Sequence, residues 1–252
     1  MTSSARGDFD LDRALPIDLE SSLPTGAAKE AVSELGQRIA NDVYLPEEIM
    51  PTEPELAESL GVSRATVRDA IKVLSGKRLV RTARRYGTRV RPVEAWNLLD
   101  ADVVAWHEPN HPRLRKMFAE TTELRSIIEP AAAALAAERA TSEQIDMILE
   151  AAYAMHPGND DPSALFVADC RFHATMLEAT GNQMMNQLRS IILTMLRISY
   201  EFGVLSVNTE PVTRQGHIDV AEAIKRRDPV AAHKAMEEML ENNRNTARQF
   251  AD

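Results

Sequence analysis

The sequence predicts a mostly α-helical protein in which a small winged helix-turn-helix precedes an all-helical bundle. Three observations indicate this fold class. Between residues 52 and 91, two short amphipathic segments that meet at a glycine are followed by two alternating segments of β character. From residue 113 onward, the chain is rich in Ala, Glu, Leu and Met. Basic residues gather in the first region, whereas the second is acidic.

The first region begins with a helix predicted over residues 27–41, where apolar residues recur every three or four positions. Thr52 starts a second helix, and Glu55 follows at the spacing of a capping box. Gly61 ends that helix because glycine readily adopts a left-handed conformation. These features predict two helices that are separated by a proline-containing loop.

A third helix is predicted over residues 64–75, and Ser63 is a suitable cap for it. Alternation over residues 79–82 and 88–91, around a basic turn, predicts a two-stranded hairpin. Two helices that are joined by a short glycine-containing turn and followed by a hairpin are typical of a winged helix-turn-helix.

The second region contains six predicted helices. Gly181 separates the third helix from the fourth, Asn182 is expected to cap the fourth, and Pro229 opens the last. Six helices in about 140 residues predict a bundle. Their approximate ranges are 113–139, 142–155, 160–180, 183–203, 208–227 and 229–250.

These elements predict four parts of the chain. Residues 1–25 form a disordered leader, and residues 26–93 form the DNA-binding winged helix-turn-helix. Residues 94–112 form a connector that is too apolar for a free linker and is expected to pack between the two domains. Residues 113–252 form an all-helical domain.

Composition limits the classes of protein. The 252 residues are 44% hydrophobic, which is enough for a buried core. No apolar run of about 18 residues exists, so no membrane association is expected. The polar leader lacks the apolar stretch of a secretory signal. The single cysteine, Cys170, excludes an internal disulfide, and together these features predict a cytoplasmic protein.

The charge is distributed unevenly. The whole chain carries −9, but residues 64–91 contain ten basic residues and one acid, giving +9. The remainder therefore carries −18. This asymmetry indicates a basic nucleic-acid-binding module joined to an acidic domain with another role. It also argues against an unspecific nucleoid protein, because the acidic domain would repel DNA.

The basic module presents residues that suit double-stranded DNA. Arg64 and Arg68 are four residues apart, so they share a helical face, and arginine can read guanine bidentately. Hydroxyl groups in the first turn can bind phosphates, and the hairpin tip places cations near the DNA backbone. The alternative is a basic face that is merely solvated. The predicted DNA-binding residues are Thr52, Ser63, Arg64, Thr66, Arg68, Arg84, Arg85 and Gly87.

Asp169 and His173 are four residues apart, which is a plausible half of a metal site. His217, on a later helix, could complete it. One alternative is an Asp–His hydrogen bond on a helix surface. Another is an enzyme, because two histidines and one carboxylate also form the site of non-haem iron oxygenases.

Residues 50–70, MPTEPELAESLGVSRATVRDA, resemble the signature of the GntR family of bacterial regulators, and residues 79–80 and 87–90 match its wing. The helical half resembles the FadR subgroup, whose effector domain is called FCD, and this resemblance implies that residues 113–252 serve effector binding and dimerisation. Together the resemblances cover about residues 27–250. Pro54 stands where many members carry a DNA-contacting arginine, which leaves the operator sequence open.

The FCD resemblance implies that Asp169, His173 and His217 bind a divalent metal, Zn²⁺ first and Ni²⁺ or Mn²⁺ as alternatives. Met239 stands where the family usually has a further histidine, so this site would have three protein ligands and open positions for an effector. The resemblance also implies that Arg125 meets an effector carboxylate, with an exposed pair to Glu129 as the alternative. Residues expected to line the same pocket are Arg197 and Tyr200.

Residues 96–103 are similar to the connector of regulators of D-galactonate and related sugar-acid catabolism. The resemblances together imply a homodimeric repressor that a small carboxylate metabolite, a sugar acid, releases from its operator. Trp96 and Trp106 in the connector are candidates for coupling the two domains.

Overall fold

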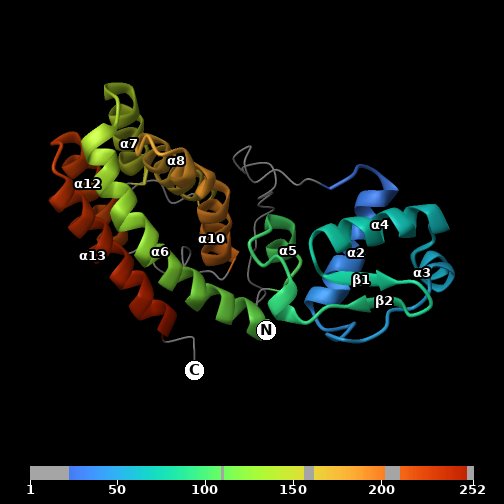
Figure 1. Cartoon of the computed structure of the whole chain (residues 1–252). Helices are drawn as coiled ribbons and strands as arrows, with labels where there is room; N and C mark the ends of the chain where they lie inside the picture. The colour runs from blue at the N-terminus through green and yellow to red at the C-terminus, as the bar shows by residue number, and fades with distance from the viewer. Residues whose placement is uncertain (1–22, 109–110, 156–161, 202–210, 249–252) are drawn as a thin grey trace. The chain divides into compact units, whose positions relative to one another are not determined.

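The computed structural model describes residues 23–108, 111–155, 162–201 and 211–248. These residues form two compact units, of which the N-terminal unit ends at Leu114 and the C-terminal unit begins at Arg115. No helix in the described ranges is long and apolar enough to cross a membrane. The predicted fold class is confirmed: helices dominate, and one small antiparallel sheet follows the first helices (Figure 1). Nearly all of the predicted leader lies outside the described residues.

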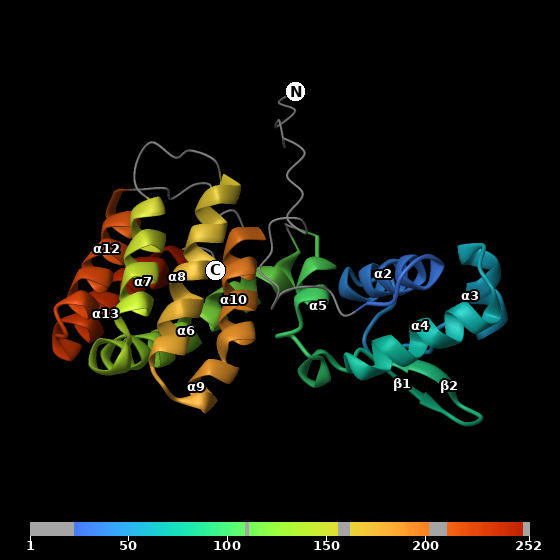
Figure 2. The same cartoon turned by 90° about the horizontal axis from the view of Figure 1, so that it is seen from above.

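The N-terminal unit is built on three helices, α2 (Ala27–Ala40), α3 (Glu53–Leu60) and α4 (Arg64–Gly76). The apolar faces of α2 and α4 pack against each other, and Figure 2 shows α3 beside the start of α4. Side chains of both helices form one buried core. Its fully buried members include Val32, Leu35, Ile39, Val67, Ala70 and Leu74.

The turn between α3 and α4 follows the predicted caps. The Glu55 carboxylate accepts hydrogen bonds from the Thr52 N–H and hydroxyl, both at 2.7 Å. Gly61 ends α3 with a φ of 65°, where a side chain would be strained. Ser63 Oγ accepts from the Thr66 N–H at 3.1 Å, which satisfies a free donor at the start of α4.

The strands β1 (Val80–Ala83) and β2 (Gly87–Val90) form the predicted hairpin, with Val80 opposite Val90. Residues 47–50 extend this sheet, a pairing that the sequence did not indicate. The Met50 N–H donates to Thr88 O at 2.8 Å, and the Val90 N–H donates to Glu48 O at 2.9 Å. The hairpin is therefore supported on the β2 side.

The connector belongs to the core of the N-terminal unit. It contains the short helices η2 (Val93–Ala95) and α5 (Ala101–Ala105). Trp96 and Trp106 are both 5% exposed and join the core of α2 and α4. Gly36 permits this packing, because a Cβ there would lie 2.4 Å from the Trp106 ring.

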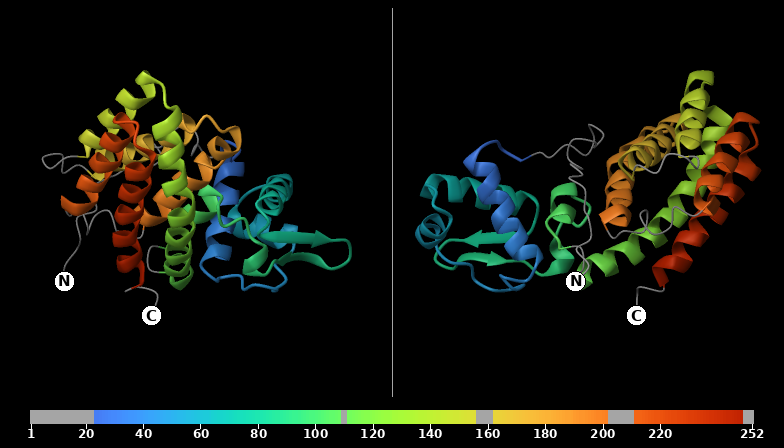
Figure 3. Two further views of the ribbon diagram at one scale, coloured as in Figure 1. Left: turned by 60° about the vertical axis from the view of Figure 1, so that its left-hand side comes forward. Right: turned by 180° about the vertical axis from the view of Figure 1, so that it is seen from behind.

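The C-terminal unit is an all-helical bundle. Within it, α7 packs on α8 and α12, α8 packs on α10, and α12 packs on α13 (Figure 3). Small and aliphatic side chains from these helices and from α6 form one buried cluster. Its helices are α6 (Pro112–Arg139), α7 (Ser142–Ala154), α8 (Pro162–Ala179), α9 (Gln183–Gln187), α10 (Arg189–Glu201), α12 (Pro211–Lys225) and α13 (Pro229–Arg248).

The prediction of one helix over residues 183–203 is wrong, because the chain breaks at Leu188 into α9 and α10. The Leu188 N–H donates to Met185 O at 3.0 Å, a three-residue turn that ends α9. The predicted cap is confirmed, since Asn182 Oδ1 accepts from the Met184 and Met185 N–H groups. Apolar periodicity continues across the break, which explains why the sequence did not reveal it.

Candidate functional site

The outer face of α4 carries the predicted DNA-reading side chains. Arg64 and Arg68 are exposed, whereas Val67 and Ala70 between and after them are buried against α2. Ser63 is exposed and Thr66 is half-buried, and their hydroxyls lie 2.8 Å apart. Packing of the apolar stripe therefore forces the two arginines outward.

Arg68 is held by a partner that the sequence analysis did not select. Its Nη2 lies 2.9 Å from Glu53 Oε2, and its Nε donates to Glu53 Oε1 at 3.4 Å. Both side chains remain substantially exposed, at 60% and 36%. The hydrogen bond with Glu53 raises the pKa of Arg68. Because the pair joins α3 to α4 across fifteen residues, no local periodicity signals it.

The hairpin tip is exposed from residue 81 to residue 87. Arg84 and Arg85 lie in the turn, and both Arg85 and Gly87 have positive φ angles, 75° and 74°. Tyr86, at 76% exposure, adds an aromatic ring between these cations and Gly87. The tip can thus present charge and a flat apolar surface to a partner. Thr52, by contrast, has its hydroxyl engaged by Glu55.

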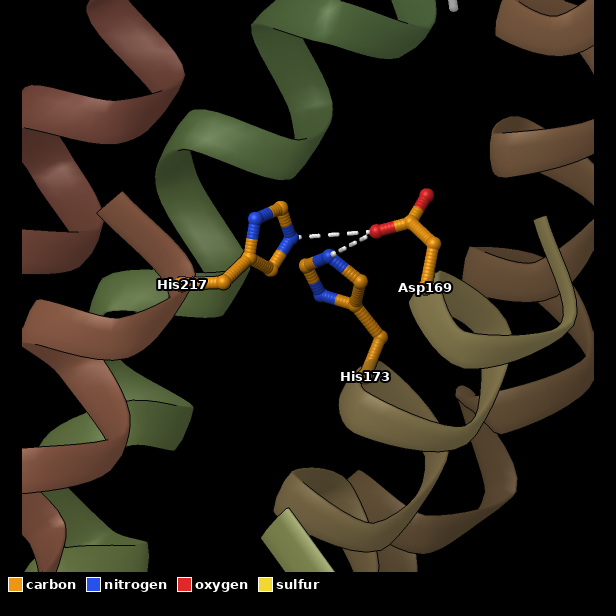
Figure 4. A group of neighbouring side chains, drawn as sticks. All are labelled: Asp169, His173 and His217. Atoms are coloured by element: carbon orange, nitrogen blue, oxygen red, sulfur yellow. Dashed lines mark hydrogen bonds and ion pairs between the residues drawn. The ribbon is translucent and has the colours of Figure 1, made fainter. Parts of the chain in front are cut away.

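A second cluster lies inside the C-terminal unit. Asp169 and His173 project from one face of α8, and His217 reaches them from α12 (Figure 4). Asp169 Oδ1 lies 3.0 Å from His217 Nε2 and 3.3 Å from His173 Nε2. All three side chains are buried, so the alternative of an Asp–His pair on a helix surface is wrong. We call these residues the Asp169 cluster.

Glu129 and Arg125, one turn apart on α6, complete the surroundings of His173. Glu129 Oε2 lies 3.0 Å from His173 Nδ1, and Glu129 Oε1 accepts from Arg125 Nε at 2.7 Å. Arg125 Nη2 is 3.4 Å from His173 Nε2. The Arg125–Glu129 pair is 5% and 0% exposed, so it is not the exposed pair that was the alternative.

Burial and charge shift the pKa values in this cluster. Burial alone would raise the pKa of Glu129, but the charges of Arg125 and His173 lower it to about 2. Burial would lower the pKa of His173, but Glu129 and Asp169 raise it to about 9. Hydrogen bonds from both histidines hold the pKa of Asp169 well below its usual range, against the effect of burial. Both carboxylates are therefore ionised.

The donor set of the Asp169 cluster fits a divalent cation. Donors of a tetrahedral zinc site stand roughly 3.4 Å apart, given metal–ligand distances near 2.1 Å. Here the ligand atoms all lie within 4.8 Å of one another. Glu129 orients His173 through Nδ1, which leaves Nε2 available once it is deprotonated. Cys170 is buried, and burial raises the pKa of its thiol.

The remaining predicted residues lie on neighbouring helices. Arg197 is 6% exposed on α10, and Tyr200 lies on the same helix with its side chain outside those that the structure describes. Met239 is 3% exposed, and its Cγ would lie 2.7 Å from a Cβ at Gly216. It therefore packs beside the turn of α12 that carries His217.

Arg214 is a residue that the sequence analysis missed. It lies three residues before His217 on α12 and is 8% exposed. The i, i+3 spacing to a selected histidine was the available signal.

Comparisons with known proteins identify the family of each half of the chain. Residues 27–90 match the model of bacterial regulatory proteins of the gntR family, and residues 120–242 match the FCD domain. The galactonate operon transcriptional repressor of Escherichia coli K12 is 35% identical over 212 residues, 83% of this chain and 91% of that one. The transcriptional repressor NanR of the same strain is 30% identical over 82% of this chain and 79% of that one.

A solved structure of Lar, which controls expression of the Listeria monocytogenes agr system, has a TM-score of 0.59 at 18% identity. It covers 90% of this chain and 98% of that one, and it supports the fold alone. The matched families and relatives are transcription regulators, so the enzyme alternative is set aside. The chain belongs to the GntR family of bacterial DNA-binding transcription regulators and carries an FCD domain in its C-terminal half.

Proposed function

We propose that this regulator is a cytoplasmic repressor that a small hydroxy acid releases from its operator. The observation that carries this proposal is the buried Asp169 cluster, which lies within the FCD region and has two ionised carboxylates and Arg125 around it. A repressor needs two states with different affinity for DNA, and an effector must bind one state better. A buried polar cluster in a helical bundle is a suitable place for such an effector.

The proposed metal is Zn²⁺, with Ni²⁺ or Mn²⁺ as alternatives, held by Asp169, His173 and His217. When bound, the ion would attract hydroxyl and carboxylate oxygens of a ligand at positions that the protein leaves open. Glu129 supports this arrangement because it fixes the orientation of the His173 ring.

The proposed effector class is the sugar acids. The name of the galactonate operon repressor motivates this choice for a chain that is 35% identical to it. Arg125 directs Nε to Glu129, which leaves other N–H groups of its guanidinium for a ligand oxygen. Arg197 and Tyr200 on α10 are proposed to line the same pocket.

The proposed DNA interface uses α4 and the hairpin of two protomers on paired half-sites. Arg64 and Arg68 would read base edges, whereas hydroxyl groups at the start of α3 and α4 would bind phosphates. The tip of the hairpin would contact the backbone or the minor groove. The hydroxyl and tip residues are Thr52, Ser63, Thr66, Arg84, Arg85 and Gly87.

The test combines metal analysis with DNA release. The purified full chain should contain about one zinc per protomer, and His173→Ala should lose it, whereas His233→Ala, on the exposed face of α13, should keep it. The operator is first selected from random duplexes by its binding to the protein. D-Galactonate or another sugar acid should then release this operator from the wild-type protein but not from His173→Ala. Two results together would overturn the metal site. The first is that neither the wild type nor His233→Ala contains metal, and the second is that both bind added zinc no more tightly than His173→Ala does.

A further inference from the structure

Ala65 lies at the centre of the outward face of α4. An α-helix turns by about 100° per residue, so Ala65 and Val67 point about 160° apart, and Ala65 and Leu74 point in opposite directions. Val67 and Leu74 are fully buried in the core of the N-terminal unit, whereas Ala65 is exposed. In the first turn of α4, Ala65 is therefore the residue that points most directly away from this core.

The long side chains beside Ala65 are directed to other partners. Arg68, one turn further along α4, has its Nη2 2.9 Å from Glu53 Oε2 on α3. Lys72, two turns along, has its Nζ 2.9 Å from Asp69 Oδ1. Because both cations are held by carboxylates, the methyl group of Ala65 stays uncovered. It forms a small apolar surface among charged side chains.

This apolar surface is complementary to one group of the DNA major groove. Guanine, cytosine and adenine present hydrogen-bonding atoms there, whereas thymine also presents a 5-methyl group. The side chain of Ala65 has no hydrogen-bonding atom, so it cannot read the polar groups of a base edge. Contact between two methyl groups removes both from water, and burial of a group of this size changes a binding constant about fourfold.

We propose that Ala65 is a specificity-determining residue that contacts the 5-methyl group of a thymine in each half-site. This inference rests on the proposed interface of α4 with DNA, and it adds an apolar contact to the hydrogen bonds assigned there to Arg64 and Arg68. The high helix propensity of alanine would also account for the residue at this position. That explanation, however, predicts no dependence of binding on a thymine methyl group.

Replacement of thymine by deoxyuridine tests this contact, because it removes only the 5-methyl group of the base. Each thymine of the selected operator is replaced in turn, and binding to the full chain is measured by fluorescence anisotropy at fixed salt. We expect one position in each half-site to respond. Replacement there should weaken binding of the wild type about fourfold in one half-site and roughly 15-fold in both.

Ala65→Gly removes the other methyl group of the proposed contact. This variant should bind the thymine and deoxyuridine operators with equal affinity, whatever its affinity for DNA as a whole. Glycine also lowers helix propensity, and Ala27→Gly controls for this effect, since Ala27 is an exposed alanine in the first turn of α2. Ala27→Gly should keep the fourfold preference for thymine.

Two results would overturn the inference and leave the proposed interface standing. In the first, every single replacement weakens binding of the wild type less than twofold. In the second, a replacement weakens the wild type and Ala65→Gly by the same factor, so that another residue contacts that methyl group. If Arg64→Ala and Arg68→Ala both bind the operator and random duplex as the wild type does, the proposed interface of α4 is wrong, and the contact of Ala65 is wrong with it.

Discussion

The Arg68–Glu53 pair of the N-terminal unit and the Arg125–Glu129 pair of the C-terminal unit have similar closest distances, 2.9 and 2.7 Å. Their surroundings differ. The first pair is 60% and 36% exposed and joins two helices, whereas the second is 5% and 0% exposed and lies within α6. Water weakens the electrostatic attraction within the first pair, whereas the buried second pair is little screened.

This difference matches the proposed roles. An exposed pair is worth little, so DNA can take Arg68 from Glu53 at small cost. A buried pair gains little net stability when intact, but removal of one partner leaves an uncompensated charge. The N-terminal unit therefore keeps an arginine available, and the C-terminal unit keeps one fixed.

Glu129→Ala should have the largest effect. It leaves Arg125 and His173 without their shared carboxylate, and we expect the C-terminal unit to lose roughly 3–5 kcal/mol of unfolding free energy. Urea unfolding of the metal-free protein measures this loss. The double variant Arg125→Met/Glu129→Leu should recover most of it, since both charges are then gone. A loss below 1 kcal/mol in Glu129→Ala would show that the pair is not insulated from water.

The two units should lose unfolding free energy at opposite ends of the pH range, because each contains a buried histidine with a shifted pKa. The N-terminal unit should lose stability as the pH falls, and the C-terminal unit as the pH rises. His107 Nε2 has no hydrogen-bond partner among the described residues, and its Nδ1 lies 2.9 Å from Val103 O. Burial lowers the pKa of His107 from 6.5 to about 4, and the nearby Arg113 and His111 contribute to this shift. Since the unfolded chain binds a proton that the folded unit excludes, stability falls between pH 6.5 and 4.

The expected loss in the N-terminal unit approaches about 3 kcal/mol at pH 4. His173 behaves oppositely. Burial lowers the pKa of His173, but Glu129 and Asp169 raise it to about 9. The protonated ring therefore stabilises the C-terminal unit fully below pH 6.5, and this stabilisation is lost as the pH rises through 9. His107→Phe should flatten the acid response between pH 6.5 and 4.5, whereas His233→Gln should not. If the unfolding free energy of both variants falls with pH at the same rate, His107 does not cause the acid response.

The sequence predicted what depends on local patterns. Helices α2 to α4, their caps and the hairpin follow from periodicity and from residues such as Gly61 and Ser63. Asp169 and His173 were paired by their spacing, and His217 was a candidate to complete the site that the family resemblance then supported. Residues 47–50 and Glu53 were missed, because their roles depend on contacts between segments that lie far apart in the sequence.

Arg68→Ala should weaken binding to the selected operator by roughly 1–3 kcal/mol, or about 5- to 150-fold, with a smaller effect on random duplex. Arg68 is exposed on α4 and would meet base edges there. Fluorescence anisotropy at fixed salt measures both affinities. Arg84→Ala, at the hairpin tip, should weaken both duplexes alike, since a phosphate contact carries no sequence information. Equal losses on both duplexes for Arg68→Ala would make Arg68 a phosphate contact too.

Glu53→Gln should have the smallest effect on stability, less than about 1 kcal/mol, because its pair with Arg68 is exposed. Its effect on recognition is more informative. Without Glu53, Arg68 loses its fixed orientation, and a negative charge leaves the DNA-facing side. Binding to random duplex should therefore rise a few-fold while the preference for the operator falls. Asp69→Asn is the matched control, since it removes an exposed carboxylate of α4 that pairs with Lys72 rather than with Arg68. If both variants change the operator preference equally, Glu53 contributes only charge, and the N-terminal pair does not prepare Arg68 for DNA.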